Sequence, residues 1–269
     1  MVYYCTLKDS NGGALFKTIV DTLSSQMSHI SMTITNDRLM LSGVDMAHVS
    51  IVNITLLSSS FSTFRKATDQ DVSMHASIDH FKRILRGCKA DDSMTMTLKH
   101  EHDTAVFVQF ENEFRTVSFK LPMLDIDQDN IDVPELEYET TVHLPASKFH
   151  TIFQDLNVLS PETVCIRSTD KYVQFASEEH GCETEMSVCA SDDVRIDWTD
   201  NVSVQVSVDK FLAYSTMSKM CEDVHLHLSC DYPVYIHFPL VRTITTNGGK
   251  KEKIHVGDCK CHIAPRTND

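Results

Sequence analysis

The motif SIDHFK at residues 77–82 returns 130 residues later as SVDKFL at residues 207–212. A second pair agrees with it: FKTIVDTL at residues 16–23 and FHTIFQDL at residues 149–156 share four of eight residues at a displacement of 133. Two matches at nearly the same displacement indicate an internal duplication. The chain of 269 residues is therefore expected to hold two similar domains.

Each copy of the first motif is followed by a helix-length segment and then by two stretches of alternating apolar and polar residues. These stretches are 94–98 and 105–110 in the first half, and 224–228 and 233–238 in the second. Alternation of period two is typical of antiparallel strands with one buried face. We expect an α+β fold with two topologically similar domains, at residues 1–121 and 140–269, joined by a connector at residues 122–139.

The expected connector carries half of the chain's net charge. The whole sequence has 24 Lys and Arg against 38 Asp and Glu, a formal charge of −14, and residues 122–139 hold seven acids and no Lys or Arg. Apolar residues, among them Ile131 and Val133, are interspersed with these acids. Composition leaves two interpretations open: an acidic solvated linker, or one wall of a groove for a partner.

A basic cluster stands out against this acidic background. Residues 79–89 have a net charge of +3 and contain Lys82, Arg83, Arg86 and Lys89. On a helix these four would share one face, because the apolar residues from Phe81 onward recur at i, i+3, i+4 and i+7 and would be buried. A solvated face and a phosphate-facing surface both fit this pattern.

Composition argues against a secreted, membrane-embedded or collagen-like chain, and missing motifs argue against an enzyme. No apolar run reaches the ~18 residues of a membrane span, and the first residues lack the basic flank of a signal peptide. Nine scattered cysteines favour reduced thiols in a cytosolic or nuclear protein. The sequence has no Walker-type phosphate loop, Gly-x-Ser-x-Gly elbow or Cys/His nucleophile motif, so we expect neither an enzyme nor a cofactor.

Fourteen histidines raise the question of a metal site. His225 and His227 would lie on one face of a strand, and Cys259, Cys261 and His262 form a compact cluster. Neither group has a second pair of ligands at structural-zinc spacing. Strand packing is therefore the preferred explanation, and no metal is expected.

Three motifs spread over the chain, at residues 41–52, 124–138 and 263–266, resemble segments of the proliferating cell nuclear antigen (PCNA) type of DNA sliding clamp. Residues 41–52, LSGVDMAHVSIV, resemble that family's SMDSSHVSLV segment. Residues 124–138 resemble its LDVEQ…IPEQEY linker, and residues 263–266, IAPR, resemble its LAPK motif. The resemblance is close to full length while identity is patchy, which suits a divergent member, such as one from a large DNA virus or a protist.

The resemblance implies a fold and an assembly. Three two-domain subunits would join head to tail in a closed homotrimeric ring around duplex DNA, with antiparallel sheets outside and helices lining the channel. Edge strands at residues 114–121 and 182–190 would pair across each joint. The implied interface residues are Phe114, Val117, Phe119, Cys182, Met186 and Val188.

The resemblance also reconciles an acidic chain with DNA binding. Acids would cover the outer surface, while the channel helices would present Lys and Arg to phosphates without reading sequence. The family's DNA-binding segment corresponds roughly to residues 66–86. The implied DNA-facing residues are Lys17, Lys82, Arg83, Arg86, Lys89, Lys148 and Lys210.

A second implied site binds partners. In the family, a short motif with apolar and aromatic anchors, the PIP box, docks beneath the interdomain connector. The partners would be a DNA polymerase, a clamp loader and other PIP-box proteins, in the nucleus or, for a virus-encoded clamp, at a viral replication site. The implied groove residues are Val44, His48, Val49, Ile51, Ile131, Val133, Pro233, Val234, Ala264 and Pro265.

The sequence departs from the family's pattern in several places. Thr151 and Gln154 stand where the family usually has Arg, so the second half should be less basic. Thr169 replaces the family's regulatory lysine, which puts ubiquitin-type regulation there in doubt, and His262 replaces an aromatic residue. Residues 241–255 are longer than usual, with an expected turn at 247–249 beside three lysines; a solvated insertion is preferred there over contact with DNA or a loader.

Two other functions stay open. The chain could be one subunit of a heterotrimeric checkpoint-type clamp, although the connector and the IAPR motif favour the replicative type. It could also be a clamp-derived interaction or transcription protein that does not encircle DNA, which the thin basic complement of the second half allows. Salt-dependent retention on circular DNA, lost on linear DNA, would separate a ring from a simple binder.

Overall fold

The chain divides into two compact units. The first unit comprises Met1–Met46 and Asn53–Ile131, and the second comprises Ala47–Val52 and Asp132–Asp269. A computed structural model describes residues 5–9, 13–100, 103–126, 133–134, 136–245 and 250–266. The expected domain boundaries at residues 121/122 and 139/140 stay a prediction.

The first unit contains strands from two mostly antiparallel sheets, together with two α-helices. One sheet has the order β5-β1-β7-β8-β9, and in the other the strands β4, β3, β2 and β6 follow one another. The elements are β1 (Cys5–Asp9), α1 (Ala14–Leu23), β2 (His29–Ile34), β3 (Arg38–Val44), β4 (Ser50–Leu57), η1 (Ser58–Ser60), β5 (Thr63–Lys66), β6 (Val72–Ser77), α2 (Ile78–Leu85), β7 (Ser93–Leu98), β8 (Ala105–Glu111) and β9 (Thr116–Pro122).

The second unit has the same kinds of element. Its strands follow the orders β14-β10-β16-β17-β18 and β13-β12-β11-β15. The elements are β10 (Thr140–Pro145), α3 (Ala146–Leu156), η2 (Asn157–Leu159), β11 (Thr163–Ser168), β12 (Tyr172–Glu179), β13 (Cys182–Cys189), β14 (Arg195–Trp198), β15 (Val202–Ser207), α4 (Val208–Ser215), η3 (Thr216–Met220), β16 (Asp223–Leu228), β17 (Val234–Thr245) and β18 (Lys251–Ile263).

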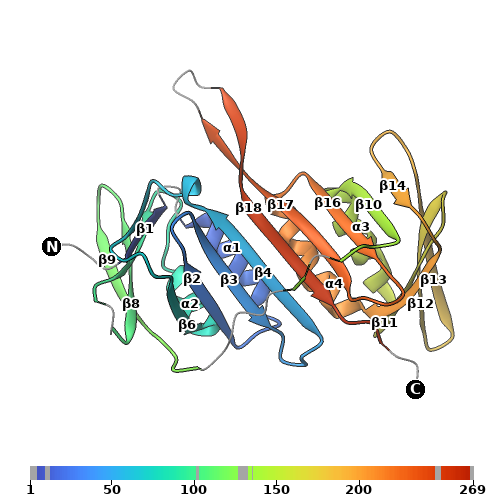
Figure 1. The fold of residues 1–269 in the computed structure, drawn as a ribbon, viewed down its shortest axis with the longest axis horizontal. Helices are drawn as coiled ribbons and strands as arrows, with labels where there is room; N and C mark the ends of the chain where they lie inside the picture. The colour runs from blue at the N-terminus through green and yellow to red at the C-terminus, as the bar shows by residue number, and fades with distance from the viewer. Residues whose placement is uncertain are drawn as a thin grey trace. The chain divides into compact units, whose positions relative to one another are not determined.

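The second unit repeats the first strand for strand (Figure 1). Adding nine to each strand number converts β5-β1-β7-β8-β9 into β14-β10-β16-β17-β18, and β4-β3-β2-β6 into β13-β12-β11-β15. In each unit one helix follows the first strand and the other follows the sixth. The α+β class and the two similar topologies predicted from the repeated motifs are confirmed.

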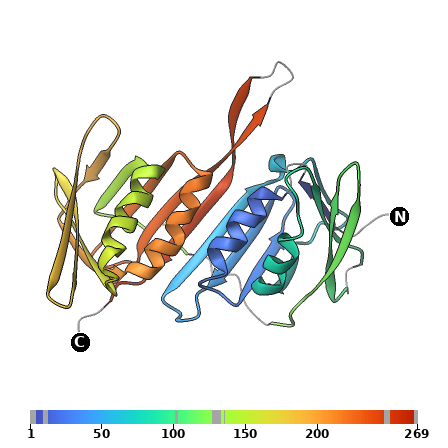
Figure 2. The same ribbon diagram turned by 180° about the vertical axis from the view of Figure 1, so that it is seen from behind.

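In each unit the two helices lie side by side on one face of a sheet (Figure 2). Their aromatic residues form the centre of each core. The rings of Phe16 on α1 and Phe81 on α2 lie 6.1 Å apart, and those of Phe153 on α3 and Phe211 on α4 stack at 4.5 Å. All four side chains are almost completely buried, because the helical spacing of the repeated motifs places these positions against the sheet.

The helix α2 is shorter than the sequence pattern suggested. It begins after Ser77, whose hydroxyl accepts a hydrogen bond from the His80 amide at 3.4 Å, and it ends at Leu85. Lys89 therefore lies in the following turn and not on the helix. The physical reason is a competing bond, because Asp92 Oδ2 accepts the Lys89 backbone N–H at 2.8 Å.

Candidate functional site

The exposed face of the first helix pair is basic. Lys17 on α1 and Arg83 on α2 are exposed, as are Arg86 at the end of α2 and Lys89 in the turn beyond it. These positions are left to solvent because the apolar residues of both helices face the sheet. Four of the cations expected from the sequence are therefore accessible to solvent, and three of these four lie on the helices or at their ends.

Lys82 is the exception within this group. Its ammonium donates to Ser24 Oγ at the end of α1, at 2.6 Å, and lies 3.7 Å from Asp21 Oδ1. Its side chain is only 29% exposed. Lys82 thus links α2 to α1, and its charge is partly balanced within the unit.

The predicted DNA-binding segment, residues 66–86, is not uniformly accessible. The Lys66 side chain is 4% exposed, and its ammonium donates to the Gln70 carbonyl at 2.9 Å and lies 3.6 Å from Asp71. Lys66 therefore stabilises a turn at the start of the segment. The accessible cations of the segment are at its α2 end.

The second helix pair is close to neutral on its exposed face. Lys148 on α3 forms an ion pair with Asp193 at 2.7 Å, and Lys210 on α4 is half-buried. Thr151 and Gln154 are exposed. Sequence reasoning missed Lys219, an exposed cation in η3, because it lies beyond the repeated motif that drew attention to α4.

The expected partner groove is partly assembled in the second unit. The Ala264 amide donates to the Val49 carbonyl at 2.8 Å, which brings the LSGVDMAHVSIV and IAPR motifs together. His48 has a left-handed backbone with φ of 57°, and both His48 and Val49 are exposed. The half-buried residues of the set are Ile51, Val133, Pro233, Ala264 and Pro265.

Three further expected groove residues are not counted in this set. Val234 is 0% exposed, so it belongs to the core, since alternation along β17 turns it towards the interior and Tyr235 outward. Val44 lies in the first unit. Ile131 lies outside the described residues.

A row of stacked rings crosses the opposite side of the β10-β16-β17-β18 sheet from the helices, and sequence reasoning did not find it. The His227 and Tyr235 rings stack at 4.6 Å, and the Tyr235 and His262 rings at 4.7 Å. Tyr138 lies 5.4 Å from His227. The sequence signals were the His225/His227 pair and His262 in place of an aromatic residue; that they meet could not be expected, because cross-strand neighbours depend on the pairing register.

Burial makes these histidines hard to protonate. It lowers the pKa of His225, His227 and His262 to about 4 in each case. Nδ1 of His262 is buried without a hydrogen-bond partner. Among the residues that the structure describes, no group of three or more His, Cys, Asp or Glu side chains is arranged to hold a metal ion.

The expected interface residues lie on or beside edge strands. β9 is the last strand of β5-β1-β7-β8-β9, and β13 is the last strand of β13-β12-β11-β15. Phe114, in the turn before β9, is 92% exposed, and Cys182 at the start of β13 is also exposed. Val117, Phe119, Met186 and Val188 are half-buried. Edge strands of this kind carry backbone groups suited to pairing with another chain.

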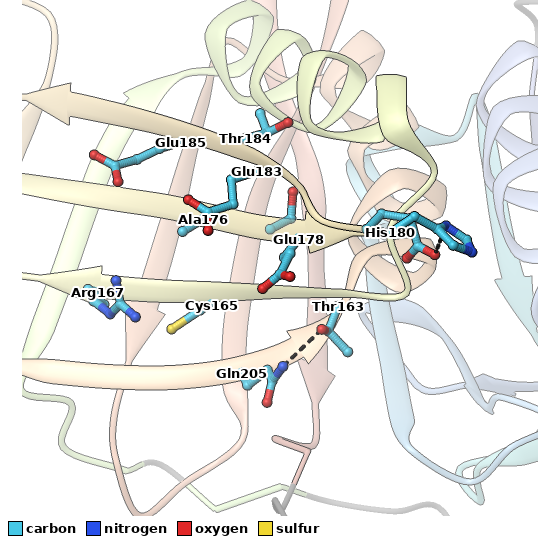
Figure 3. Close-up of a pocket in the computed structure, with 12 residues that line it drawn as sticks. Thr163, Cys165, Arg167, Ala176, Glu178, His180, Glu183, Thr184, Glu185 and Gln205 are labelled. Atoms are coloured by element: carbon cyan, nitrogen blue, oxygen red, sulfur yellow. Dashed lines mark hydrogen bonds and ion pairs between the residues drawn. The ribbon is translucent and has the colours of Figure 1, made fainter.

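A hollow of about 530 Å³ lies on one face of the β13-β12-β11-β15 sheet (Figure 3). Its lining includes Glu178, Glu183 and Glu185 together with Arg167 and Cys165, so its net charge is negative. Cys165 Sγ lies 3.8 Å from the Ser203 hydroxyl, which is not a base of the kind that activates a nucleophile. The negative lining disfavours phosphate, so the hollow does not resemble a nucleotide site.

No helix within the described ranges has the length and apolar character needed to cross a membrane.

Comparison with known proteins agrees with the fold. Residues 8–131 match the family "Proliferating cell nuclear antigen, N-terminal domain", and residues 132–247 match its C-terminal domain counterpart. The second match ends within the β17–β18 hairpin. Proliferating cell nuclear antigen 2 of Drosophila melanogaster is 24% identical over 259 residues, which cover 95% of each chain. The crystal structure of PCNA from Entamoeba histolytica superposes with a TM-score of 0.83 at 22% identity, covering 99% of this chain and all of the other.

The duplicated sheets and paired helices define a two-domain DNA clamp fold. With both domains matched in order along the chain, this protein belongs to the proliferating cell nuclear antigen family of sliding clamps, as a divergent member. Members of this family are clamps without enzymatic activity that take part in DNA replication and repair.

Proposed function

We propose that this protein is a DNA sliding clamp, a polymerase processivity factor that encircles duplex DNA as a homotrimeric ring. The observation that carries the proposal is the basic face of α1 and α2 on a chain of net charge −14. Lys17, Arg83 and Arg86 would contact phosphates without reading bases, which suits a protein that must slide. Lys89, Lys148 and Lys210 would contribute at the margins, and Lys82 would mainly position α2.

The homotrimer is supported by the two edge strands. β9 and β13 would pair between neighbouring subunits, with Phe114, Val117 and Phe119 on one side and Cys182, Met186 and Val188 on the other. Such a heterologous contact closes into a ring when the rotation between subunits permits. In this proposal the domain boundaries are 1–121, 122–139 and 140–269.

The partner groove would bind PIP-box-type motifs of a polymerase, a clamp loader and repair proteins. The exposed His48 and Val49 beside Ala264 would form its floor, with the half-buried Tyr235 in place of Val234. Aromatic and apolar anchors in such a pocket account for most of the binding free energy. The protein would act in the nucleus, or at a viral replication site if a virus encodes it.

A second candidate follows from the second helix pair. Because Lys148 is paired with Asp193 and the exposed Thr151 and Gln154 are neutral, half of the expected channel attracts DNA weakly. A subunit of a heterotrimeric checkpoint-type clamp, or a clamp-derived protein that does not encircle DNA, would tolerate such a surface.

Retention on DNA circles tests the proposal. The protein is loaded with a clamp loader on nicked circular DNA, and the circles are isolated by gel filtration in moderate salt. A ring stays on the circle and is lost when a restriction enzyme linearises it. Equal retention on circular and linear DNA would identify a binder that does not encircle, and retention that requires two further clamp subunits would identify the heterotrimer.

A further inference from the structure

The hairpin of β17 and β18 continues well beyond the sheet that it belongs to (Figure 1). Its register shifts between Leu240 and Val241, where Gly257 has a φ of 152°, a conformation that favours glycine. A bulge of this kind bends and twists a ribbon, so the hairpin leaves the sheet at this point. We call the part beyond the bulge, Val241–Thr245 with Lys250–His255, the arm.

The arm is basic within an acidic protein. Residues 241–255 contain Arg242, Lys250, Lys251 and Lys253 against a single acid, Glu252, a net charge of +3 with histidine neutral. The rest of the chain then has a charge of −17, since the whole has −14. All three lysines are exposed. The arm is therefore a local site of attraction for a polyanion.

The strand register places two lysines in a line along one face. Lys251 and Lys253 alternate along β18 and so share this face, opposite to that of Ile254. Neighbours in this line are about 6.8 Å apart, roughly twice the 3.4 Å axial spacing of phosphates along one DNA strand. Thr243, directly across from Lys253, adds a hydroxyl of the kind that binds phosphate oxygens.

Two of the lysines form ion pairs that phosphate can replace. Lys253 pairs with Glu222, and Lys250 lies 3.5 Å from Glu252. All four side chains are about half exposed or more, and exposed ion pairs contribute little to stability. Exchanging such a carboxylate for a phosphate therefore costs little.

We propose that the arm is a second contact for duplex DNA, in which Lys250, Lys251 and Lys253 bind the phosphate backbone separately from the helices α1 and α2. A protruding two-stranded ribbon with cations along one face suits a nucleic-acid backbone, which presents regularly spaced charges. The arm needs no closed ring for this contact, so the inference does not depend on the proposed clamp function.

The test measures binding to a short linear duplex, on which a ring gains nothing from encirclement. The full-length protein and the variant Lys250→Gln/Lys251→Gln/Lys253→Gln are titrated with a fluorescent 30-base-pair duplex at several salt concentrations. We expect the slope of log K against log[salt] to fall by about 2 to 3, since each phosphate contact contributes about 0.9. Affinity at low salt should fall at least tenfold.

The matched control removes the same charge elsewhere in the second unit. Lys171→Gln/Arg195→Gln/Lys260→Gln changes three exposed basic residues outside the arm and should leave the slope nearly unchanged. The opposite change, Glu222→Gln/Glu252→Gln, removes the competing carboxylates and should tighten binding. Melting temperatures of all variants confirm that each one folds.

The proposal would be overturned if the arm variant and the control variant lowered DNA affinity equally. It would also be overturned if the Glu222→Gln/Glu252→Gln protein bound DNA no more tightly than the unchanged protein. The arm would then be a surface for an acidic protein partner. Because circle retention is measured independently, the clamp proposal can fail while the arm proposal holds, and the reverse.

Discussion

The Lys82 ammonium on α2 donates to the Ser24 hydroxyl at the end of α1, over 2.6 Å. This bond joins the two helices of the first unit, and Asp21 at 3.7 Å balances part of the charge. Lys82, which the resemblance places among the DNA-facing residues, is therefore hydrogen-bonded and ion-paired within its own unit. Arg83 and Arg86, by contrast, are exposed on the same helix or at its end.

The first prediction separates these two roles. Arg83→Gln/Arg86→Gln should lower the salt slope of DNA binding by about 2, because two phosphate contacts are lost. Lys82→Gln should change the slope by less than half as much and lower the free energy of unfolding by about 0.5–1 kcal/mol. Salt-dependent anisotropy and denaturant unfolding measure both. A larger loss of DNA binding in Lys82→Gln than in Arg83→Gln/Arg86→Gln would contradict this assignment.

The second prediction concerns a buried hydroxyl pair. Ser50 Oγ and Tyr214 OH lie 2.6 Å apart in the interior of the second unit. Tyr214→Phe should lower the free energy of unfolding by about 1–3 kcal/mol, because it removes this bond and leaves a buried Ser50 hydroxyl less well satisfied. Tyr172→Phe, at a half-buried ring, is the control and should cost under about 0.5 kcal/mol. Equal effects in urea unfolding would be evidence against the bond.

The third prediction is acid sensitivity. Since the pKa of His225, His227 and His262 is lowered to about 4 by burial, the unfolded chain takes up protons more readily than the folded one. The contribution of these histidines to the free energy of unfolding is therefore fully present above about pH 6.5, the usual pKa of histidine in an unfolded chain. It is lost as the pH falls towards about 4. After allowance for solvent screening we expect a loss of about 1 kcal/mol for each histidine.

A carboxylate on the same sheet, Asp258, acts in the same direction at lower pH. The pKa of Asp258 is lowered mainly by its hydrogen bond with His237, at 2.7 Å, so its contribution is lost on further acidification. The variant His262→Phe should flatten the dependence of the melting temperature on pH between 6.5 and 4.5. An unchanged pH profile in that variant would show that His262 does not contribute.

The fourth prediction tests the edge strands. Phe114→Lys and Cys182→Lys change exposed positions, so each should change the melting temperature little while preventing assembly, because a lysine on an edge opposes strand pairing. Val158→Lys, at another exposed apolar residue, is the control and should leave assembly intact. Native mass spectrometry reports the outcome. Assembly that survives both edge variants would mean that the subunits meet elsewhere.

The duplication made the topology predictable from sequence. Two repeated motifs and the alternating stretches that follow them were enough to expect two equivalent α+β units. The strand expected at 233–238 begins within one residue of the start of β17, but β17 continues to Thr245. The sequence pattern weakens there because a ribbon exposed on both faces no longer alternates between apolar and polar residues.

The candidate sites were less predictable, for identifiable reasons. Lys66 and Lys82 looked like surface cations, but their ion pairs depend on folded contacts with Asp71 and Asp21. Val234 was expected in the partner groove, but the alternation of side chains along β17 places it in the core. The ring row of His227, Tyr235 and His262 arises only when three strands pair in one register.

The native mass in solution, measured over a range of protein concentrations, tests the proposed ring most directly. For a homotrimeric ring we expect a species of three chains of 30.4 kDa, about 91 kDa, that persists on dilution and is lost in the Phe114→Lys variant. A strict monomer at high concentration would contradict an autonomous homotrimeric ring.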